Sequence, residues 1–274
     1  MMKKTTIHDY SKEHIAYLNA IKRKNIFISC MRYLIIIVFI LFWELSAMLG
    51  WSDPFISSSP SRFIVSIANL YKEGALFKHI GITLFETVVG FVVGTVLGTL
   101  IAILLWWSNT LSRILDPYLV VLNALPKIAL GPILIVWFGA GVESIIVMGL
   151  LISLIVTIMS VLAGFNEITD EKQFLMKTLG ATKYQILTMV VLPASVPTIM
   201  NALKLSVGMS WVGVIVGEYL VSKSGLGYLI VYGGQVFKLD LVMASIVILC
   251  ILAALMYYVV AYFEKRMIKW RTHE

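Results

Sequence analysis

Long apolar runs separated by short polar segments dominate the hydrophobic pattern of this chain. Six runs contain about the 20 residues that an α-helix needs to cross the hydrocarbon core of a bilayer. Each run is continuously apolar, which excludes the alternating strands of a transmembrane β-barrel. The pattern therefore predicts an all-α integral membrane protein with six transmembrane helices, at residues 31–50, 82–107, 118–138, 144–164, 197–220 and 241–263.

Prolines and glycines distinguish two of these runs from the others. Pro126 and Pro132 lie inside the third run, and proline removes a helical hydrogen bond, so we expect a kink or a break there. In the second run Gly90, Gly94 and Gly98 recur every four residues. Because small residues let another helix approach closely, this spacing predicts a helix-packing face.

The basic residues predict how the chain is oriented. Lys and Arg concentrate in the segment before the first run, in the tail after residue 263 and in loops on that same face, with fifteen on this face and five on the other. By the positive-inside rule both termini are cytoplasmic. The net charge of +7 is therefore a topology signal, and a nucleic-acid partner is not expected.

Three parts of the chain follow from this pattern. Residues 1–30 form a cytoplasmic amphipathic segment, residues 31–263 form the membrane domain with a cytoplasmic loop at 165–196, and residues 264–274 form a basic tail. The helix predicted at residues 9–25 has two interpretations: it lies on the inner membrane surface, or it is a solvated helix without a partner. The basic N-terminal segment with its long apolar run indicates a membrane span that is retained, rather than a signal peptide that is cleaved.

Residue patterns for catalysis, metal binding and ATP binding are absent from the sequence. The four histidines are scattered outside the spans without ligand spacing, so no metal site is expected. No GxxxxGK[ST] phosphate loop occurs, and no residues form a catalytic constellation. We therefore expect neither an enzyme nor a cofactor in this chain alone.

Charged side chains in or near the spans are candidates for a solute pathway, because a charge at membrane depth is costly unless it pairs, snorkels or faces water. For Lys204 and Glu44 we favour snorkelling toward a helix end. For Lys127 and Glu218 a path or gate role and an ordinary helix-end position are equally supported. The candidate path or gate residues are Lys127, Glu218, Pro126 and Trp211.

The polar segment KTLGATKYQILTMVVLP, residues 177–193, predicts two short amphipathic helices joined at one glycine. Gly180 can end the first helix in the left-handed conformation. Thr182 and Gln185 have the spacing of a capping box that starts a second helix, which runs until Pro193, and Pro197 is placed to open the fifth span. From the residues alone, this loop lies on the membrane surface or docks a protein.

The spacing of this loop resembles the EAA loop of ABC importer permeases, EAA-x3-G-x9-I-x-LP. Gly180 is followed by nine residues, Val190, one residue and Leu192-Pro193. Residues 116–141, 179–211 and 217–227 resemble the nitrate, sulfonate and taurine branch of these permeases. The sequence departs from the pattern where Phe174-Leu175-Met176 replaces Glu-Ala-Ala, and Glu86 stands where the branch often has a basic residue.

The resemblance implies a type I (MetI-like) permease fold in a bacterial cell membrane and a set of partners. Two permease copies, expected as a homodimer, would form the path for a small solute that an external binding protein delivers. Two ATPase subunits would carry ATP and Mg. In this family the ATPases dock at the coupling loop, which maps here to Lys177, Thr178, Leu179, Gly180, Ala181, Thr182 and Lys183.

Two other classes of protein compete with this interpretation. An ion- or proton-coupled secondary transporter would work without an ATPase, but it would leave the loop without a purpose, and the sequence has no convincing internal repeat. A membrane scaffold or binding subunit without transport is the other alternative. The substrate stays open between sulfonates, nitrate, bicarbonate and vitamins or their precursors, and a heterodimer of permeases also stays open.

Overall fold

The computed structural model describes residues 12–268 except residues 52 and 169, and every regular element among these residues is a helix. The chain divides into two units, residues 1–64 and 65–274. In the first unit, α1 (Lys12–Met48) and α2 (Pro54–Ser57) precede α3 (Pro60–Lys72), which continues into the second unit. The ring centroids of Trp43 and Phe63 lie 5.7 Å apart, so the start of α3 contacts the end of α1.

Two features of the first unit differ from the prediction. α1 is one uninterrupted helix that includes most of the predicted surface helix and most of the first apolar run. Glu44 has a partner that the prediction did not include: its carboxylate accepts hydrogen bonds from the Ser61 backbone N–H at 3.0 Å and from the Ser61 hydroxyl at 2.6 Å. A carboxylate that caps the first turn of a helix satisfies orphan backbone donors, which explains why Glu44 faces α3.

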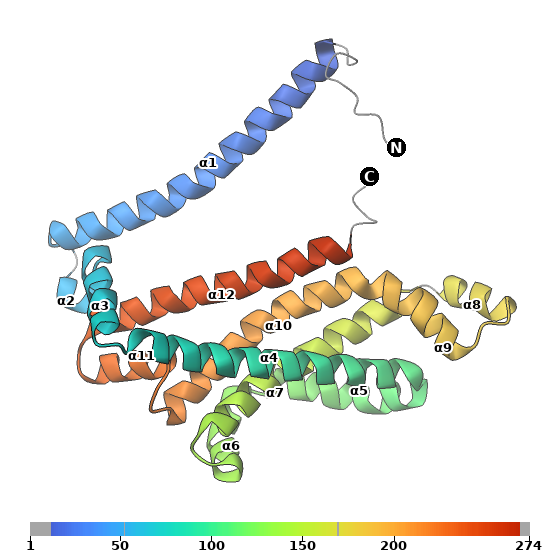
Figure 1. Cartoon of the computed structure of the whole chain (residues 1–274). Coiled ribbons are helices and arrows are strands. Elements are labelled where there is room, and N and C mark those ends of the chain that lie inside the picture. The colour runs from blue at the N-terminus through green and yellow to red at the C-terminus, as the bar shows by residue number, and fades with distance from the viewer. Residues whose placement is uncertain (1–11, 52, 169, 269–274) are drawn as a thin grey trace. The chain divides into compact units, whose positions relative to one another are not determined.

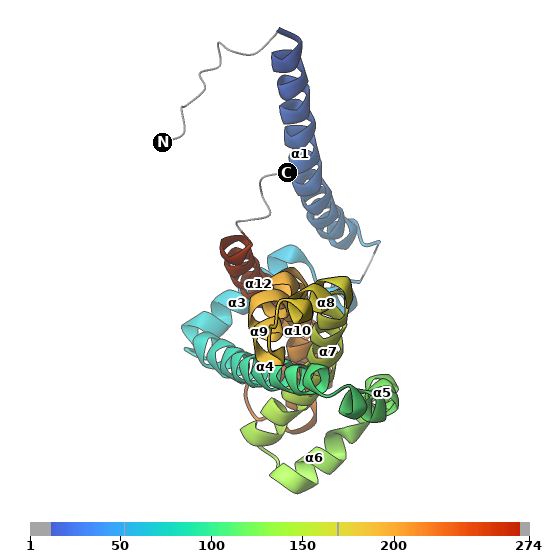
Figure 2. The ribbon, with the colours of Figure 1, turned by 90° about the vertical axis from the view of Figure 1, so that its right-hand side faces the viewer.

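The second unit is a bundle of long helices with short helices at its ends (Figure 1). Figure 2 views it from the end that carries α8 and α9, where α4, α7 and α10 lie together. After α3 its elements are α4 (Leu76–Trp107), α5 (Asn109–Ala124), η2 (Lys127–Leu130), α6 (Gly131–Phe138), α7 (Val142–Asn166), α8 (Asp170–Thr178), α9 (Lys183–Ile186), η3 (Leu187–Val191), α10 (Leu192–Val221), α11 (Leu226–Gln235) and α12 (Leu239–Met267).

Five helical segments of the described chain are long and apolar enough to cross a bilayer, and a sixth crossing results if a bent pair counts as one span. That pair is α5 with the segment Lys127–Phe138, which meet at 88°. The break lies at Leu125, whose backbone is extended (φ −64°, ψ 133°), because the ring of the following proline disfavours a helical conformation at the preceding residue. The break expected from Pro126 is therefore confirmed.

α7 lies between α4 and α10 and makes the most extensive helix contacts in the bundle. On the α4 side, Gly90, Gly94 and Gly98 all lie against α7; a Cβ atom at Gly98 would come within 2.8 Å of Cβ of Thr157. On the α10 side, a Cβ atom at Gly213 would lie 2.5 Å from the Cα atom of Gly149. Glycine allows backbones to approach this closely because it has no side chain.

The start of the fifth span differs from the prediction. The helical path runs without a break from Lys183 to Val221, so Pro193 does not end a helix and Pro197 lies inside α10. The five residues Leu187–Val191 form a π-helical turn, and Pro193 follows at the second position of α10. Proline has no backbone N–H to donate. It is tolerated at this position because the π-helical turn changes the local hydrogen-bond register, and because the first residues of a helix do not need their N–H groups.

We predict that Gly213→Ala destabilises the bundle by about 1–3 kcal/mol, the usual cost of overpacking. The added methyl group would meet the backbone of Gly149, which cannot rotate away, so the clash outweighs the higher helix propensity of alanine. The measurement is thermal unfolding of the detergent-solubilised protein. Gly208→Ala on the same helix is the control, because no atom lies within 4 Å of its Cβ position. Equal melting temperatures for the two variants would contradict the packing role.

Candidate functional site

Two structured regions lie at opposite ends of α10 and contain most of the polar features of the second unit (Figure 1). The first is the turn between α8 and α9, residues 177–183, which we call the Gly180 turn. The second is the junction at which the end of α10 leads into α11. The helical path from Lys183 to Val221 joins the two regions. α10, its main part, has 30 residues and spans roughly 45 Å at about 1.5 Å per residue.

Gly180 ends α8 in a Schellman motif. The backbone N–H of Ala181 donates to the carbonyl of Met176 at 2.9 Å, and the N–H of Gly180 donates to the carbonyl of Lys177 at 3.0 Å. Gly180 has φ +80°, the left-handed conformation that glycine adopts without a steric cost. Apart from its two chain neighbours, no described residue lies within 4 Å of the position that its Cβ would occupy, so the turn faces open space.

A capping box starts α9, as the spacing of Thr182 and Gln185 predicts. The Gln185 side-chain oxygen accepts the Thr182 backbone N–H at 2.7 Å, and the Thr182 hydroxyl oxygen accepts the Gln185 backbone N–H at 3.4 Å. The two halves of the box satisfy donors that the first turn of a helix leaves unpaired. The Gly180 turn is thus fixed on both sides by hydrogen bonds of its own segment.

The apolar side chains around the turn point in two directions. Phe174, Leu175 and Leu179 are exposed, with relative accessibilities of 67%, 60% and 74%. Met176 and Ala181 instead pack against a buried cluster of the bundle. Three large apolar side chains on one short exposed segment form a patch of the kind that marks a protein or membrane contact.

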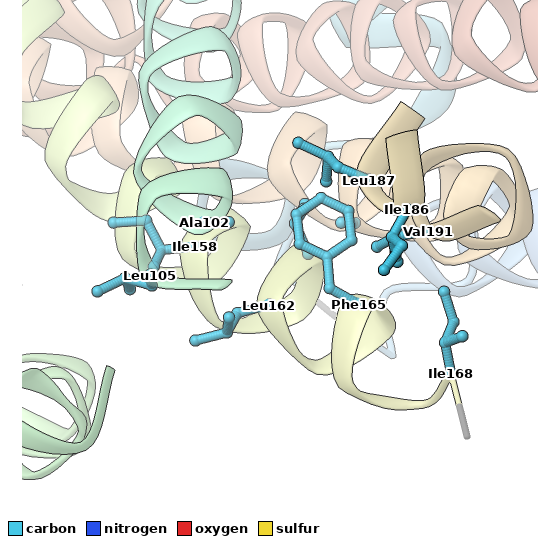
Figure 3. Packing of buried hydrophobic residues seen from close by; sticks show 11 residues of the cluster. Ala102, Leu105, Ile158, Leu162, Phe165, Ile168, Ile186, Leu187 and Val191 are labelled. Carbon is cyan, nitrogen blue, oxygen red and sulfur yellow. The ribbon is translucent and has the colours of Figure 1, made fainter. Parts of the chain in front are cut away.

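The buried cluster beneath the Gly180 turn fastens the loop to three long helices (Figure 3). Phe165, near the end of α7, is fully buried at its centre, with Leu105 of α4 on one side and Ile186 and Leu187 of the loop on the other. The cluster comprises Ala102, Leu105, Ile158, Val161, Leu162, Phe165, Ile168, Ile186, Leu187, Val191 and Ala202. Since the core is continuous, the loop cannot move without moving the helix ends.

At the other end of α10, three consecutive backbone N–H groups find side-chain acceptors. Gly225 donates to Nδ1 of His79 at 2.9 Å, Leu226 to the hydroxyl oxygen of Thr83 at 2.8 Å, and Gly227 to a carboxyl oxygen of Glu218 at 2.6 Å. The first turn of a helix has no internal acceptors for these groups. α4 and α10 together therefore cap the start of α11.

Glu218 and Glu86 form a buried carboxyl pair at this junction, and each side chain is 1% exposed. Glu86 lies beside Glu218, and no other donor among the described residues reaches its two oxygens. Cβ atoms at Gly225 and Gly227 would collide with the Glu218 side chain, so the glycines permit the close approach. The carboxyl pair is thus enclosed by α4, α10 and the α11 turn.

The other candidate path residues make no hydrogen bond or ion pair to this junction within the described part of the chain. Lys127 is half-buried at the bend after α5, and its ammonium donates to the Asn123 carbonyl at 3.2 Å. Pro126 is exposed at the same bend. Trp211 is 6% exposed and packs in a cluster between α10 and α12. The structure therefore places Lys127 and Pro126 together and brings neither beside Glu218.

Lys204 differs from the prediction that its side chain snorkels toward a helix end. Its ammonium forms an ion pair with the Glu264 carboxylate of α12, with nitrogen–oxygen distances of 2.9 Å to both oxygens. The partner lies 60 residues away in the sequence, so the pair depends on how α10 and α12 meet. Pairing lowers the cost of a charge in an apolar bundle, and this replaces the need to reach a helix end.

Two sets of residues at these contacts were not singled out from the sequence. His79 and Thr83 were overlooked because an acceptor for a distant backbone N–H leaves no local pattern. Gly149 and Gly213 were also overlooked, although Gly213 and Gly217 repeat the four-residue spacing that marked α4. The spacing of Gly213 and Gly217 marks α10 as a second helix with a close-packing face.

The fold and these two regions define a membrane-transport subunit. It is a helical bundle with a loop at one end that is anchored by a buried core and exposes apolar side chains. The chain belongs to the family of binding-protein-dependent transport system inner membrane components, whose model matches residues 94–269. It is the permease subunit of an ABC importer, a multi-pass inner membrane protein rather than an enzyme, and ATP hydrolysis belongs to a separate chain.

Relatives and solved structures agree with this membership. The putative aliphatic sulfonates transport permease protein of Bacillus subtilis is 31% identical over 85% of both chains. The formylaminopyrimidine transport permease protein of Halalkalibacterium halodurans is 29% identical over 87% of this chain and 94% of its own. A chain of the inward-facing MetNI methionine ABC transporter matches with a TM-score of 0.63 and 21% identity, covering 72% of this chain and 97% of that one. The expected MetI-like fold is confirmed.

We predict that Thr83→Val loosens α11 by about 1–3 kcal/mol, the usual cost of leaving a buried donor unpaired. Valine keeps the shape of threonine but offers no acceptor to the N–H of Leu226, which is fully buried. The measurement is hydrogen exchange of the amides of residues 225–235. Thr95→Val is the control, because the Thr95 hydroxyl bonds only to carbonyls of its own helix. Equal exchange in both variants would show that Thr83 does not hold α11.

Proposed function

We propose that two copies of this chain form the translocation path of an ABC importer whose ATP and Mg are bound by two partner ATPase subunits. The Gly180 turn is the docking point for an ATPase, and both chain termini lie on the same cytoplasmic side. An extracytoplasmic binding protein delivers the solute at the opposite face. Family membership supports this assembly, because binding-protein-dependent transport is the activity by which the family is described.

The observation that carries the docking role is the combination of exposure and anchorage at the Gly180 turn. Phe174, Leu175 and Leu179 are presented outward, while Met176 is held in the core beneath them. A patch that only rested on lipid would not need a continuous core that ties it to α4, α7 and α10. A rigid, anchored patch suits a contact that transmits force, because packed cores move as units.

The continuous helical path from Lys183 to Val221 links the Gly180 turn mechanically to the α11 junction. It begins beside the Gly180 turn and ends at Glu218, which caps α11 at the other face. When the ATPases close, a shift of the turn is passed along α10 to the junction with α11. Alternating access then follows as a change between two arrangements of the bundle that partner binding biases.

Lys127, Pro126, Glu218 and Trp211 are proposed to act along the path or at its gates. Lys127 and Pro126 lie at the 88° bend that follows α5, and irregular backbone at membrane depth is tolerated where it is covered by protein or lines an aqueous cavity. Glu218 acts through α11, whose first turn it caps. Trp211 lies where α10 meets α12, so a shift between these helices would move it.

For the solute we propose a small sulfonate-like anion or a vitamin precursor. Two of the relatives are named for aliphatic sulfonates and for formylaminopyrimidine. Both names denote small polar molecules. Competition for uptake between a sulfonate and a pyrimidine precursor in membrane vesicles distinguishes the two classes.

The docking proposal predicts that Gly180→Asn leaves the bundle folded but weakens ATPase association about tenfold. Asparagine tolerates the left-handed conformation of φ +80°, and no atom of this chain obstructs its side chain. It does, however, add bulk to the face that a partner would cover. The measurements are co-purification with the ATPase and cross-linking of single cysteines at residues 179 and 181, with and without ATP.

Gly74→Asn is the matched control, because Gly74, in the turn between α3 and α4, also has a positive φ of +68° and open surroundings among the described residues. It carries the same Schellman pair of hydrogen bonds, from Gly74 to the Tyr71 carbonyl and from Ala75 to the Leu70 carbonyl. We expect this variant to bind the ATPase normally. If Gly180→Asn binds the ATPase as tightly as Gly74→Asn, and ATP changes no cross-link, the Gly180 turn is not the docking point. Loss of folded protein in both variants would point to the backbone conformation instead.

A further inference from the structure

A cavity of about 370 Å³ lies behind the Gly180 turn, between the start of α5 and the two short helices of the loop. It is separate from the exposed face of Phe174, Leu175 and Leu179, none of which lines it. Its volume is within the range of small-ligand sites. The polar and aromatic lining consists of Trp106, Asn109, Ser112, Asn166, Gln173, Lys177 and Lys183.

The cavity carries positive charge without a compensating carboxylate. Lys177 and Lys183 line it, and no Asp or Glu does. The Lys177 ammonium makes no ion pair or hydrogen bond within the described part of the chain. Of the acidic residues that precede Lys177 in the sequence, the Glu167 carboxylate accepts the Thr198 hydroxyl at 3.4 Å and Glu171 lies outside the lining. A free ammonium beside neutral donors favours an anionic ligand.

Lys183 is held in position for such a ligand. Its ammonium donates to the Trp107 carbonyl at 2.5 Å and lies 5.7 Å from the centroids of the Trp106 and Trp107 rings. Cation–π contact and a single acceptor leave the ammonium with unused donor capacity, since a lysine has three donors. The side chain is therefore pre-organised at one wall of the cavity.

The position of the cavity relative to the membrane decides what kind of anion can reach it. Trp106 and Trp107 are the last residues of α4, and tryptophans at the end of an apolar span mark the boundary between hydrocarbon and headgroups. Leu105 and Ile186 add apolar wall to the same cavity. A site at this depth, with apolar and cationic walls together, matches a lipid whose phosphate reaches the lysines.

We propose that this cavity binds the phosphate of an anionic phospholipid headgroup through Lys177 and Lys183. Asn109 and Ser112 offer further donors, and the Nε2 of Gln173 is engaged only by a long 3.4 Å bond to the Ile168 carbonyl. The bound lipid fastens the start of α5 to the Gly180 turn. Lys177 and Lys183 also belong to the turn that we propose docks an ATPase, so lipid binding and ATPase binding are measured separately.

The test is native mass spectrometry of the full-length purified permease with dioleoyl phosphatidylglycerol, dioleoyl phosphatidylcholine or glycerol 1-phosphate. We expect phosphatidylglycerol to bind, and each of Lys177→Gln and Lys183→Gln to weaken it roughly fivefold, as one lysine contributes at a membrane surface. Lys172→Gln is the matched control, because this lysine lies on α8 outside the cavity. It is expected to bind like the unaltered protein.

The other outcomes overturn the proposal in distinguishable ways. Equal phosphatidylglycerol binding by all three variants would show that these lysines do not form the site. If glycerol 1-phosphate binds as tightly as the lipid, the cavity takes a soluble phosphate rather than a membrane component. If Lys177→Gln and Lys183→Gln reduce ATPase co-purification while lipid binding is unchanged, the two lysines serve the protein contact instead.

Discussion

The structure depends on the close backbone contact of α7 with its two neighbours. Apolar side chains give little preference for one helix over another inside a bilayer, because lipid tails are equally apolar, so shape and a few polar contacts decide which helices meet. Gly98 on α4 and the pair Gly149 and Gly213 provide the shape. Thr157 of α7 and Ser206 of α10 add a hydrogen bond of 2.6 Å between helices. With α7 fixed in this way, both ends of α10 acquire defined positions.

The two ends of α10 differ in how their backbone hydrogen bonds are satisfied. At the Gly180 turn the polar backbone is satisfied within the loop, and an apolar core around Phe165 fastens the turn to the bundle. At the α11 junction the backbone donors are satisfied from outside, by His79, Thr83 and Glu218. The first arrangement leaves a face open for a partner, whereas the second makes α11 sensitive to the relative position of α4 and α10. An importer needs both a contact point and a responsive element.

Buried polar groups are concentrated where helices of distant sequence meet. Lys204 pairs with Glu264, and Glu86 lies beside Glu218 in a region enclosed by three helices. In an apolar medium such a group costs free energy unless it is paired, so the Lys204–Glu264 pair and the bond from the Gly227 N–H to Glu218 favour one arrangement of the helices over shifted ones. In the cavity behind the Gly180 turn a charge is left unpaired instead. The Lys177 ammonium has no partner within the described residues and faces accessible space.

The sequence by itself determined the features that local physics controls. Apolar run length determined the number of spans, Pro126 determined the break, and Gly180 with Thr182 and Gln185 determined the turn and its caps. Tertiary structure alone decided the pairing of Lys204 with Glu264, the acceptors His79 and Thr83, and the continuity of the helix past Pro193. These depend on atoms that come together only when the helices pack. A capping box joins residues three apart, whereas the bond from Leu226 to Thr83 joins residues 143 apart, and no local pattern encodes such a distance.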